Sequence, residues 1–272
     1  MNPWWRSALR FAVFLALLAF TGFVTDGAAA DVQLISKAEP LRVLTLGDSI
    51  TAGVAAGGGA AQDGGYRGTL GDLLTQNGYH AVFVGTRSDY SANIQNRAHD
   101  GWPGYVLRSF PADPGPGQLY GSLTERALQQ THPDIVLLMA GTNDLMRLER
   151  RVPGYTLGNI LHSMDMLLAE IFKIDPSVRV IVAPVVSSPR VSADTIAAFD
   201  GNLTPIAENY AKHGYRITIA SEMQKSVPRD VAHFPDRIHP SGDGGYADVA
   251  HAWLEAIEQV TGSPKALPVA EQ

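Results

Sequence analysis

The sequence contains no cysteine. A chain without cysteine forms no disulfides, has no thiolate nucleophile, and cannot hold a metal through thiolate ligands. Its stability must therefore come from a hydrophobic core. The composition supports such a core, because 45% of the 272 residues are hydrophobic and only 18% are charged. One globular domain is the simplest organisation that fits these numbers.

Basic residues are also scarce relative to acidic ones, with 21 Lys and Arg against 27 Asp and Glu. Leaving out residues 1–30 changes the balance to 19 against 26, a formal charge of −7. Nucleic acids and anionic membranes bind basic surfaces, so we expect neither as a partner. The sequence does not indicate an oligomeric state.

A hydrophobic run long enough for a transmembrane helix is missing as well. The apolar stretch 11–24 (FAVFLALLAFTGFV) has 14 residues, fewer than the ~20 that cross a bilayer. Arg6 and Arg10 precede it, and small residues at Ala28 and Ala30 follow it. This layout is typical of a secretory signal peptide cleaved after Ala30, and an uncleaved anchor helix is the alternative.

Three segments follow from this interpretation. Residues 1–30 are the predicted signal peptide, residues 31–262 the folded domain, and residues 263–272 a loose tail with two prolines and no periodicity. We therefore expect a secreted or periplasmic protein with no stable membrane insertion once the signal has been removed.

Five apolar runs in the domain have the composition of buried strands: residues 41–46, 80–84, 134–139, 178–183 and 215–220. Helical patterns separate them, most clearly over residues 157–174, where apolar side chains recur every three or four residues. Residues 245–260 form the last such pattern. Strands alternating with helices predict an α/β fold with a parallel sheet covered on both faces.

Polar or glycine-rich residues follow the first three runs. Asp48 and Ser49 come after the first, Gly85 after the second, and Asn143 after the third. The carboxyl ends of parallel strands lie at one edge of the sheet, so these residues are expected to meet there. Taken alone, each stretch is also explained as a turn or a helix cap.

A serine hydroxyl needs a base to become a nucleophile, and the base needs a group that orients it. Of the eight histidines, His239 has the most suitable context, because Asp236 precedes it by three residues and Pro240 follows it. A D-x-x-H turn can bring the carboxylate to one imidazole nitrogen and leave the other facing a nucleophile. By itself, this spacing also occurs in structural turns.

Attack on an ester carbonyl creates an oxyanion that needs hydrogen-bond donors. The backbone N–H groups of Ser49 and Gly85 and the side-chain amide of Asn143 are the candidates. Glycine lets the backbone approach a substrate closely, and an amide donates without titrating.

These four blocks resemble the SGNH hydrolases, also called the GDSL esterase and lipase superfamily, along nearly the whole mature chain. The matching residues are Ser49 in GDSI, Gly85 in FVGT, Asn143 in GTND and His239 in DRIHP. One departure is Ile50, where the superfamily's name implies leucine. The resemblance implies a flavodoxin-like, three-layer α/β/α fold with a five-stranded parallel sheet.

The same resemblance implies roles for the residues. Ser49 is then the nucleophile, His239 the base and later the acid, and Asp236 its orienting partner. Ser49, Gly85 and Asn143 are the oxyanion donors. Acyl transfer through a serine needs no cofactor, and the sequence offers no convincing metal-binding cluster.

Two further stretches, GGYRGTLGDLLTQNGY at 64–79 and HDGWPGY at 99–105, are similar to the acetylxylan esterases of carbohydrate esterase family 3. The resemblance places a His-x-Gly-x-x-Gly segment beside the active site, and His99 begins it here. Trp102 and Tyr105 offer flat faces to a sugar ring, or pack the loop against the domain. Together with Asp48, these three residues are the candidates for substrate binding.

The sequence therefore predicts a secreted serine esterase that removes acyl groups, acetyl in particular, from an ester substrate such as acetylated xylan. A periplasmic lipid esterase, a lysophospholipase or a thioesterase on the same scaffold is the first alternative. A non-catalytic carbohydrate-binding protein and an acetyltransferase are less favoured, and the sequence does not separate transfer to a sugar from transfer to water.

Overall fold

The computed structural model describes residues 40–262 except 92, 114, 116, 187 and 243. The predicted signal peptide (residues 1–30) and the predicted tail (residues 263–272) lie outside the described residues. No helix within the described ranges is both long and apolar enough to cross a membrane.

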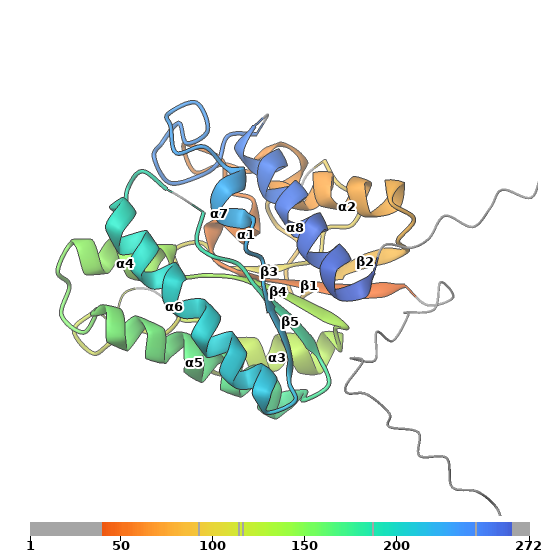
Figure 1. Ribbon diagram of the computed structural model, residues 1–272. Helices are drawn as coiled ribbons and strands as arrows, with labels where there is room; N and C mark the ends of the chain where they lie inside the picture. Colours follow the sequence, from red (N-terminus) through yellow and green to blue (C-terminus); the bar gives the residue numbers. More distant parts are fainter. Residues whose placement is uncertain are drawn as a thin grey trace, which may run out of the picture. The chain divides into compact units, whose positions relative to one another are not determined.

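The centre of the fold is a parallel β-sheet with the strand order β2-β1-β4-β5-β6 (Figure 1). All five predicted strands are present, with ends within one residue of the expected positions: β1 (Leu41–Gly47), β2 (Ala81–Val84), β4 (Ile135–Met139), β5 (Arg179–Val182) and β6 (Arg216–Ile219). A sixth strand, β3 (Asp100–Gly101), pairs with the end of β1. The prediction of five strands missed it, because two residues show no periodicity.

Helices cover both faces of the sheet. One layer contains α3 (Ser122–Thr131), α4 (Thr142–Glu149), α5 (Leu157–Ile174) and α6 (Ala193–Lys212). The other contains α1 (Ser49–Ala52), α2 (Tyr66–Gln76), α7 (Met223–Ser226) and α8 (Gly245–Thr261), with a short 3₁₀ turn η1 (Gln62–Gly64) before α2. The predicted three-layer α/β/α fold is confirmed.

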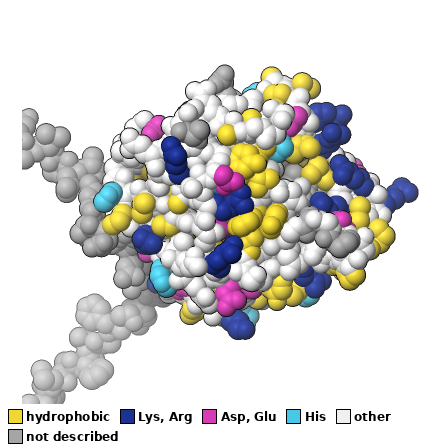
Figure 2. Space-filling model, turned by 180° about the vertical axis from the view of Figure 1, so that it is seen from behind, with side chains coloured by type: hydrophobic (Ala, Val, Ile, Leu, Met, Phe, Trp, Pro, Cys, Tyr) yellow, Lys and Arg dark blue, Asp and Glu magenta, His cyan; other side chains and the backbone are white. Residues whose placement is uncertain are grey.

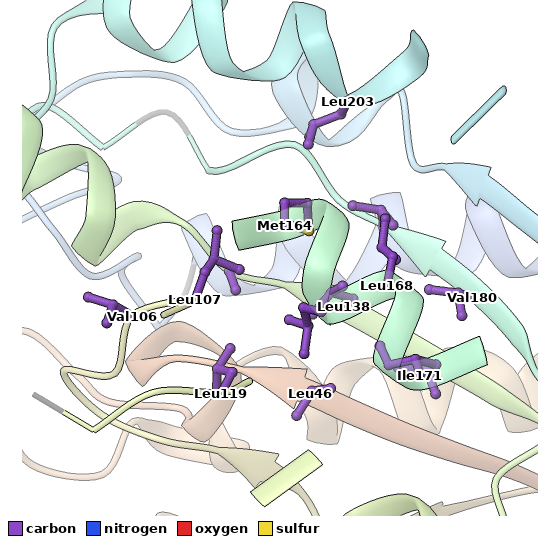
Figure 3. Packing of buried hydrophobic residues seen from close by; sticks show 14 of the residues in the cluster. Leu46, Val106, Leu107, Leu119, Leu138, Met164, Leu168, Ile171, Val180 and Leu203 are labelled. Atoms are coloured by element: carbon purple, nitrogen blue, oxygen red, sulfur yellow. The ribbon is translucent and has the colours of Figure 1, made fainter. Parts of the chain in front are cut away.

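Side-chain alternation along the strands supplies both layers with apolar contacts. In β1, Leu44 and Leu46 pack toward α5, while Val43 points to the opposite layer. Figure 3 shows Leu46 and Leu138 on the side of the sheet that Met164 and Leu168 of α5 cover. All five residues of β4 are buried, as expected for a central strand with helices on both sides.

Helix α5 has the predicted bounds, because its sequence carries both the apolar period and a cap. The Thr156 side chain accepts a hydrogen bond from the Asn159 backbone N–H at the start of the helix. Its buried face consists of Ile160, Ser163, Met164, Leu167, Leu168, Ile171 and Phe172.

The outer surface mixes side chains of different kinds. On the face seen in Figure 2, hydrophobic side chains lie among Lys and Arg side chains. Within the described ranges, Val231 is the one large hydrophobic residue classed as exposed, at 67%. It lies in the loop between α7 and α8.

The end of β1 lies at the point where the order of the strands changes direction. From β1 the chain crosses to β2 on one side, and it later returns to β4 on the other side. Ligands of open parallel sheets bind at such a switch point, outside the carboxyl ends of the strands. Gly47 and the residues that follow it lie there.

Candidate active site

Ser49 lies at a tight turn between β1 and α1. A side chain on Gly47 would place its Cβ 2.1 Å from the Met139 carbonyl oxygen of β4, so only glycine fits. Asp48 caps α1 by accepting the Ile50 backbone N–H at 3.0 Å, and α1 begins at Ser49. The turn therefore holds Ser49 at the carboxyl edge of the sheet, where its side chain is nearly buried.

His239 joins Ser49 and Asp236 into a chain of hydrogen bonds. Its Nε2 lies 2.9 Å from Ser49 Oγ, across 190 residues of sequence, and its Nδ1 lies 2.7 Å from Asp236 Oδ2. With Nδ1–H donating to the carboxylate, Nε2 is free to accept the serine proton. The three predicted catalytic residues are thus brought together in the order that acyl transfer requires.

The D-x-x-H turn itself positions the carboxylate. Asp236 Oδ1 accepts the backbone N–H groups of Ile238 at 2.9 Å and His239 at 2.7 Å. Burial by itself would raise the pKa of Asp236, but the hydrogen bonds from the His239 ring and from these two N–H groups hold that pKa below its usual value. Asp236 therefore stays ionised at neutral pH, as an orienting group should.

Asn143 is held beside the end of β4. It is the second residue of α4, and its Nδ2 donates to the Tyr105 carbonyl oxygen at 3.0 Å. The Arg147 Nη1 donates to the Asn143 backbone carbonyl, also at 3.0 Å. One hydrogen of the amide is used in this way, and the second is available for an oxyanion.

Gly85 follows β2, where the backbone of His99 crosses it closely. A Cβ at Gly85 would lie 2.4 Å from the His99 carbonyl carbon, so a side chain is excluded. This close crossing explains why residue 85 is a glycine without reference to catalysis. Its role as an oxyanion donor stays a prediction.

The placement of two residues corrects the expectation that they bind substrate. His99 is fully buried; its Nδ1 accepts the Gly101 N–H at 3.0 Å, and its Nε2 donates to the Asp89 carbonyl oxygen at 2.8 Å. Burial lowers the pKa of His99 to about 4, so its ring is neutral. Asp48 is likewise 1% exposed and serves as the cap of α1, and burial raises its pKa to about 6. Neither side chain has surface with which to contact a ligand.

Trp102 and Tyr105 lie next to the serine turn. The Trp102 N–H donates to the Gly47 carbonyl oxygen at 2.9 Å, so this segment runs along the end of β1. The two rings lie 5.2 Å apart, and Arg87 Cζ lies 4.2 Å from the centroid of the Trp102 ring. Packing occupies much of both rings, but both residues keep some exposure, and their contact with substrate stays a prediction.

Arg67 is not among the residues predicted from the sequence, although its buried guanidinium holds the C-terminal end of α1. Its Nε donates to the Thr51 carbonyl oxygen at 3.2 Å, and its Nη2 donates to the Ala52 carbonyl oxygen at 2.9 Å and to Ser91 Oγ at 2.8 Å. Burial lowers the pKa of Arg67 to about 10, which still leaves it charged at neutral pH. Arginines are usually exposed, so nothing in the sequence distinguishes this one.

Asp144 was missed as well, although it directly follows Asn143. Its buried carboxyl accepts the Leu107 N–H with both oxygens, at 3.1 and 3.2 Å, and so fixes the segment that follows Tyr105. Burial raises the pKa of Asp144 to about 8. Within the described ranges, no group of three or more His, Asp or Glu side chains is arranged to hold a metal ion.

A comparison with known families identifies the chain. The family model described as "GDSL-like Lipase/Acylhydrolase family" matches residues 45–246. The chain belongs to this family. Ser49, Asn143 and His239 all lie within the matched range, so the hydrogen-bonded chain described above falls in the part shared with other GDSL-like acylhydrolases.

A curated relative of this GDSL-like protein is a multidomain esterase from Ruminococcus flavefaciens, 30% identical over 269 residues. The alignment covers 92% of this chain but only 32% of the relative, so the chain spans about a third of that protein's length.

Solved structures share its fold. A family 3 carbohydrate esterase from Clostridium thermocellum has a TM-score of 0.61 at 23% identity, covering 82% of this chain and 98% of that one. A family 3 carbohydrate esterase from Talaromyces cellulolyticus has a TM-score of 0.60 at 23% identity, covering 81% and 98%. A catalytic mutant of an acetylxylan esterase from Geobacillus stearothermophilus has a TM-score of 0.52 at 20% identity, covering 82% and 96%.

Replacing Arg67 tests its role in holding α1. Arg67→Met keeps an apolar stem but leaves buried carbonyl groups without donors, so we expect the free energy of unfolding to fall by about 2–4 kcal/mol. Urea denaturation measures this loss. Amide hydrogen exchange should also become faster in residues 50–53, because their restraint is lost.

Arg42→Met is the matched control. Arg42 also donates to backbone carbonyls, those of Thr131 and His132, but at the opposite end of β1. Equal exchange rates at residues 50–53 in the two variants would contradict a specific role of Arg67 in positioning the serine.

Asp144→Asn tests the effect of the raised pKa. The folded state binds a proton at Asp144 up to about pH 8, whereas the unfolded state releases it near pH 4. Stability therefore falls as the pH rises through this window, and an amide removes that loss. Relative to the original protein, the free energy of unfolding of Asp144→Asn should therefore rise by at least about 1 kcal/mol between pH 5 and pH 8, which corresponds to one pKa unit. Urea denaturation at the two pH values measures this difference.

Asp72→Asn is the control for this measurement, because Asp72 is exposed on α2. If the stability difference between Asp144→Asn and the original protein is the same at both pH values, Asp144 does not titrate in this window.

Proposed function

We propose that this chain is a secreted serine esterase that removes acetyl groups from an acetylated polysaccharide such as xylan. The observation that carries the proposal is the hydrogen-bonded chain of Ser49, His239 and Asp236, with distances of 2.9 and 2.7 Å. A polysaccharide does not enter a cell, so a substrate of this kind agrees with the signal peptide predicted at residues 1–30.

The first half of the reaction forms an acyl-enzyme. Ser49 Oγ attacks the ester carbonyl carbon, and its proton passes to His239 Nε2. The N–H groups of Ser49 and Gly85 and the Asn143 amide donate to the oxyanion that develops. When this intermediate collapses, His239 returns the proton to the alcohol oxygen of the sugar, which leaves.

The second half releases acetate. A water molecule gives its proton to His239 and attacks the acyl carbon, and the second tetrahedral intermediate expels Ser49 Oγ, which recovers its proton from His239. Asp236 keeps the imidazole in one orientation through both halves and stabilises its charged form.

Three comparisons support acetylated carbohydrate as the substrate class. Two structural neighbours are family 3 carbohydrate esterases, and a third is a catalytic mutant of an acetylxylan esterase. These neighbours share at most 23% of their residues with this chain, so the substrate class is our inference rather than a property of the fold.

Hydrolysis of a series of esters tests the proposal. The purified protein is assayed on p-nitrophenyl acetate, butyrate and decanoate and on acetylated xylan, with Ser49→Ala as the blank. We expect acetate release and a preference for acetyl, and we expect Ser49→Ala to lower kcat by about four to six orders of magnitude. Preference for decanoate would instead indicate a lipid esterase, and turnover that does not depend on Ser49 would rule out the mechanism.

Asn143→Ala tests the oxyanion donor separately. Loss of one such donor costs about 10²–10³ in kcat, since it acts mainly in the transition state. Steady-state kinetics on p-nitrophenyl acetate measures it, and Asn202→Ala, on the exposed side of α6, is the control. An effect confined to KM would make Asn143 a substrate-binding residue instead.

A further inference from the structure

An open pocket of about 390 Å³ is lined in part by Tyr105 and Arg147, which are both hydrogen-bonded to Asn143. Its polar side chains are Tyr105, Asp113 and Arg147, and glycine and proline residues form the rest of the lining. The volume is near the lower end of the range for small-molecule sites, about 300–1,000 Å³. No residue of the catalytic triad lines the pocket.

Two of these residues connect the pocket directly to the predicted oxyanion donor. The Tyr105 carbonyl oxygen accepts a hydrogen bond from Asn143 Nδ2, and Arg147 Nη1 donates to the Asn143 backbone carbonyl, both at 3.0 Å. Trp102, three residues before Tyr105, is bonded to Gly47 in the serine turn. The pocket therefore shares two of its lining residues with the hydrogen bonds that hold Asn143.

Arg147 and Asp113 form an ion pair at the pocket, with Arg147 Nε 2.5 Å from Asp113 Oδ2. The side chains are 19% and 23% exposed, so the pair is accessible without being fully hydrated. Nε and Nη1 of Arg147 are in use, and no described residue accepts a hydrogen bond from Nη2. The pair thus places a guanidinium group and a carboxylate in the lining of the same pocket, where the Tyr155 hydroxyl and the Gly115 N–H also face Asp113.

The charges of this pair indicate the kind of ligand. Because the two charges balance, the pocket does not favour an anion, and its polar groups do not favour an acyl chain. Neighbouring hydroxyl groups suit it, since each hydroxyl can accept from Arg147 Nη2 or donate to Asp113. A Cβ added at the exposed Gly104 would meet no atom within 4 Å, so this side of the pocket leaves room for a ring.

We propose that this pocket binds one sugar ring of the substrate through two neighbouring hydroxyls, with Arg147 and Asp113 as the polar contacts. The inference rests on the proposed function and deepens it, because it assigns the recognition of the carbohydrate to specific residues. Arg147 is then a specificity-determining residue, and the acetyl group to be removed lies on this ring or on its neighbour.

Relative activity on two substrates tests the proposal. Acetylated xylotriose contains the sugar, whereas p-nitrophenyl acetate does not. For Arg147→Met we expect the ratio of kcat/KM on acetylated xylotriose to kcat/KM on p-nitrophenyl acetate to fall at least about tenfold, mainly through KM, because hydrogen bonds to a charged group are lost. If both substrates lose the same factor, Arg147 acts only through Asn143 and the proposal is wrong.

Arg150→Met is the matched control, since Arg150 is an exposed arginine at the end of the same helix. It should leave the ratio unchanged. A ratio that falls equally in both variants would point to a general effect of positive charge on this helix and would also overturn the proposal.

Binding separates this inference from the esterase proposal. Titration of Ser49→Ala with unacetylated xylotriose, followed by NMR or calorimetry, measures sugar binding without any reaction. We expect binding that weakens at least about tenfold when Arg147→Met is added and that persists with Arg150→Met. Absence of binding, or equal binding by both double variants, would overturn the pocket assignment, whereas absence of Ser49-dependent turnover would overturn only the esterase.

Discussion

The hydrogen-bonded pairing of β1 with three other strands is the constraint on which the site depends. β1 pairs with β2, β4 and the short β3, so its carboxyl end is held from both sides. Gly47 approaches the Met139 carbonyl oxygen so closely that no side chain fits between them. The chain then turns, and Ser49 is presented beside residues contributed by distant parts of the chain.

Buried polar groups hold the loops around this edge. Arg67 binds the last carbonyls of α1, Asp144 binds the backbone N–H of Leu107, and His99 links the Asp89 and Gly101 segments. Each forms hydrogen bonds, and an unpaired polar group in the same position would be strongly destabilising. The loops are irregular in secondary structure, but these contacts make them parts of one framework.

Asn143 connects the proposed chemistry with the proposed recognition of the sugar. Its side chain is bonded to the backbone of Tyr105, and its own backbone is bonded to Arg147. A ligand held by Arg147 and Asp113 therefore contacts the same helix turn that supplies the predicted oxyanion donor. Preorganised donors of this kind are effective because they need no rearrangement during the reaction.

Local patterns in the sequence predicted the main strands, one long helix and the residues of the candidate site. Apolar runs located the five main strands, a three-to-four-residue period located α5, and GDSI, GTND and DRIHP identified the residues that the fold brings together. Strands, helices and short motifs can be predicted from the sequence because they depend on residues that are neighbours along the chain. The burial of His99 and Asp48 could not be predicted from the sequence. Both were therefore predicted to contact the substrate, although neither has exposed surface.

Only the tertiary structure decided the remaining points. The two-residue β3, the buried guanidinium of Arg67, and the pairing of Arg147 with Asp113 all arise where segments far apart in the sequence meet. Arginine and aspartate are ordinary surface residues in most contexts, so their type says little about burial. The sequence by itself therefore determined the five main strands, α5 and α8, and the prediction that Ser49, His239 and Asp236 act together, while long-range packing decided which polar groups support them.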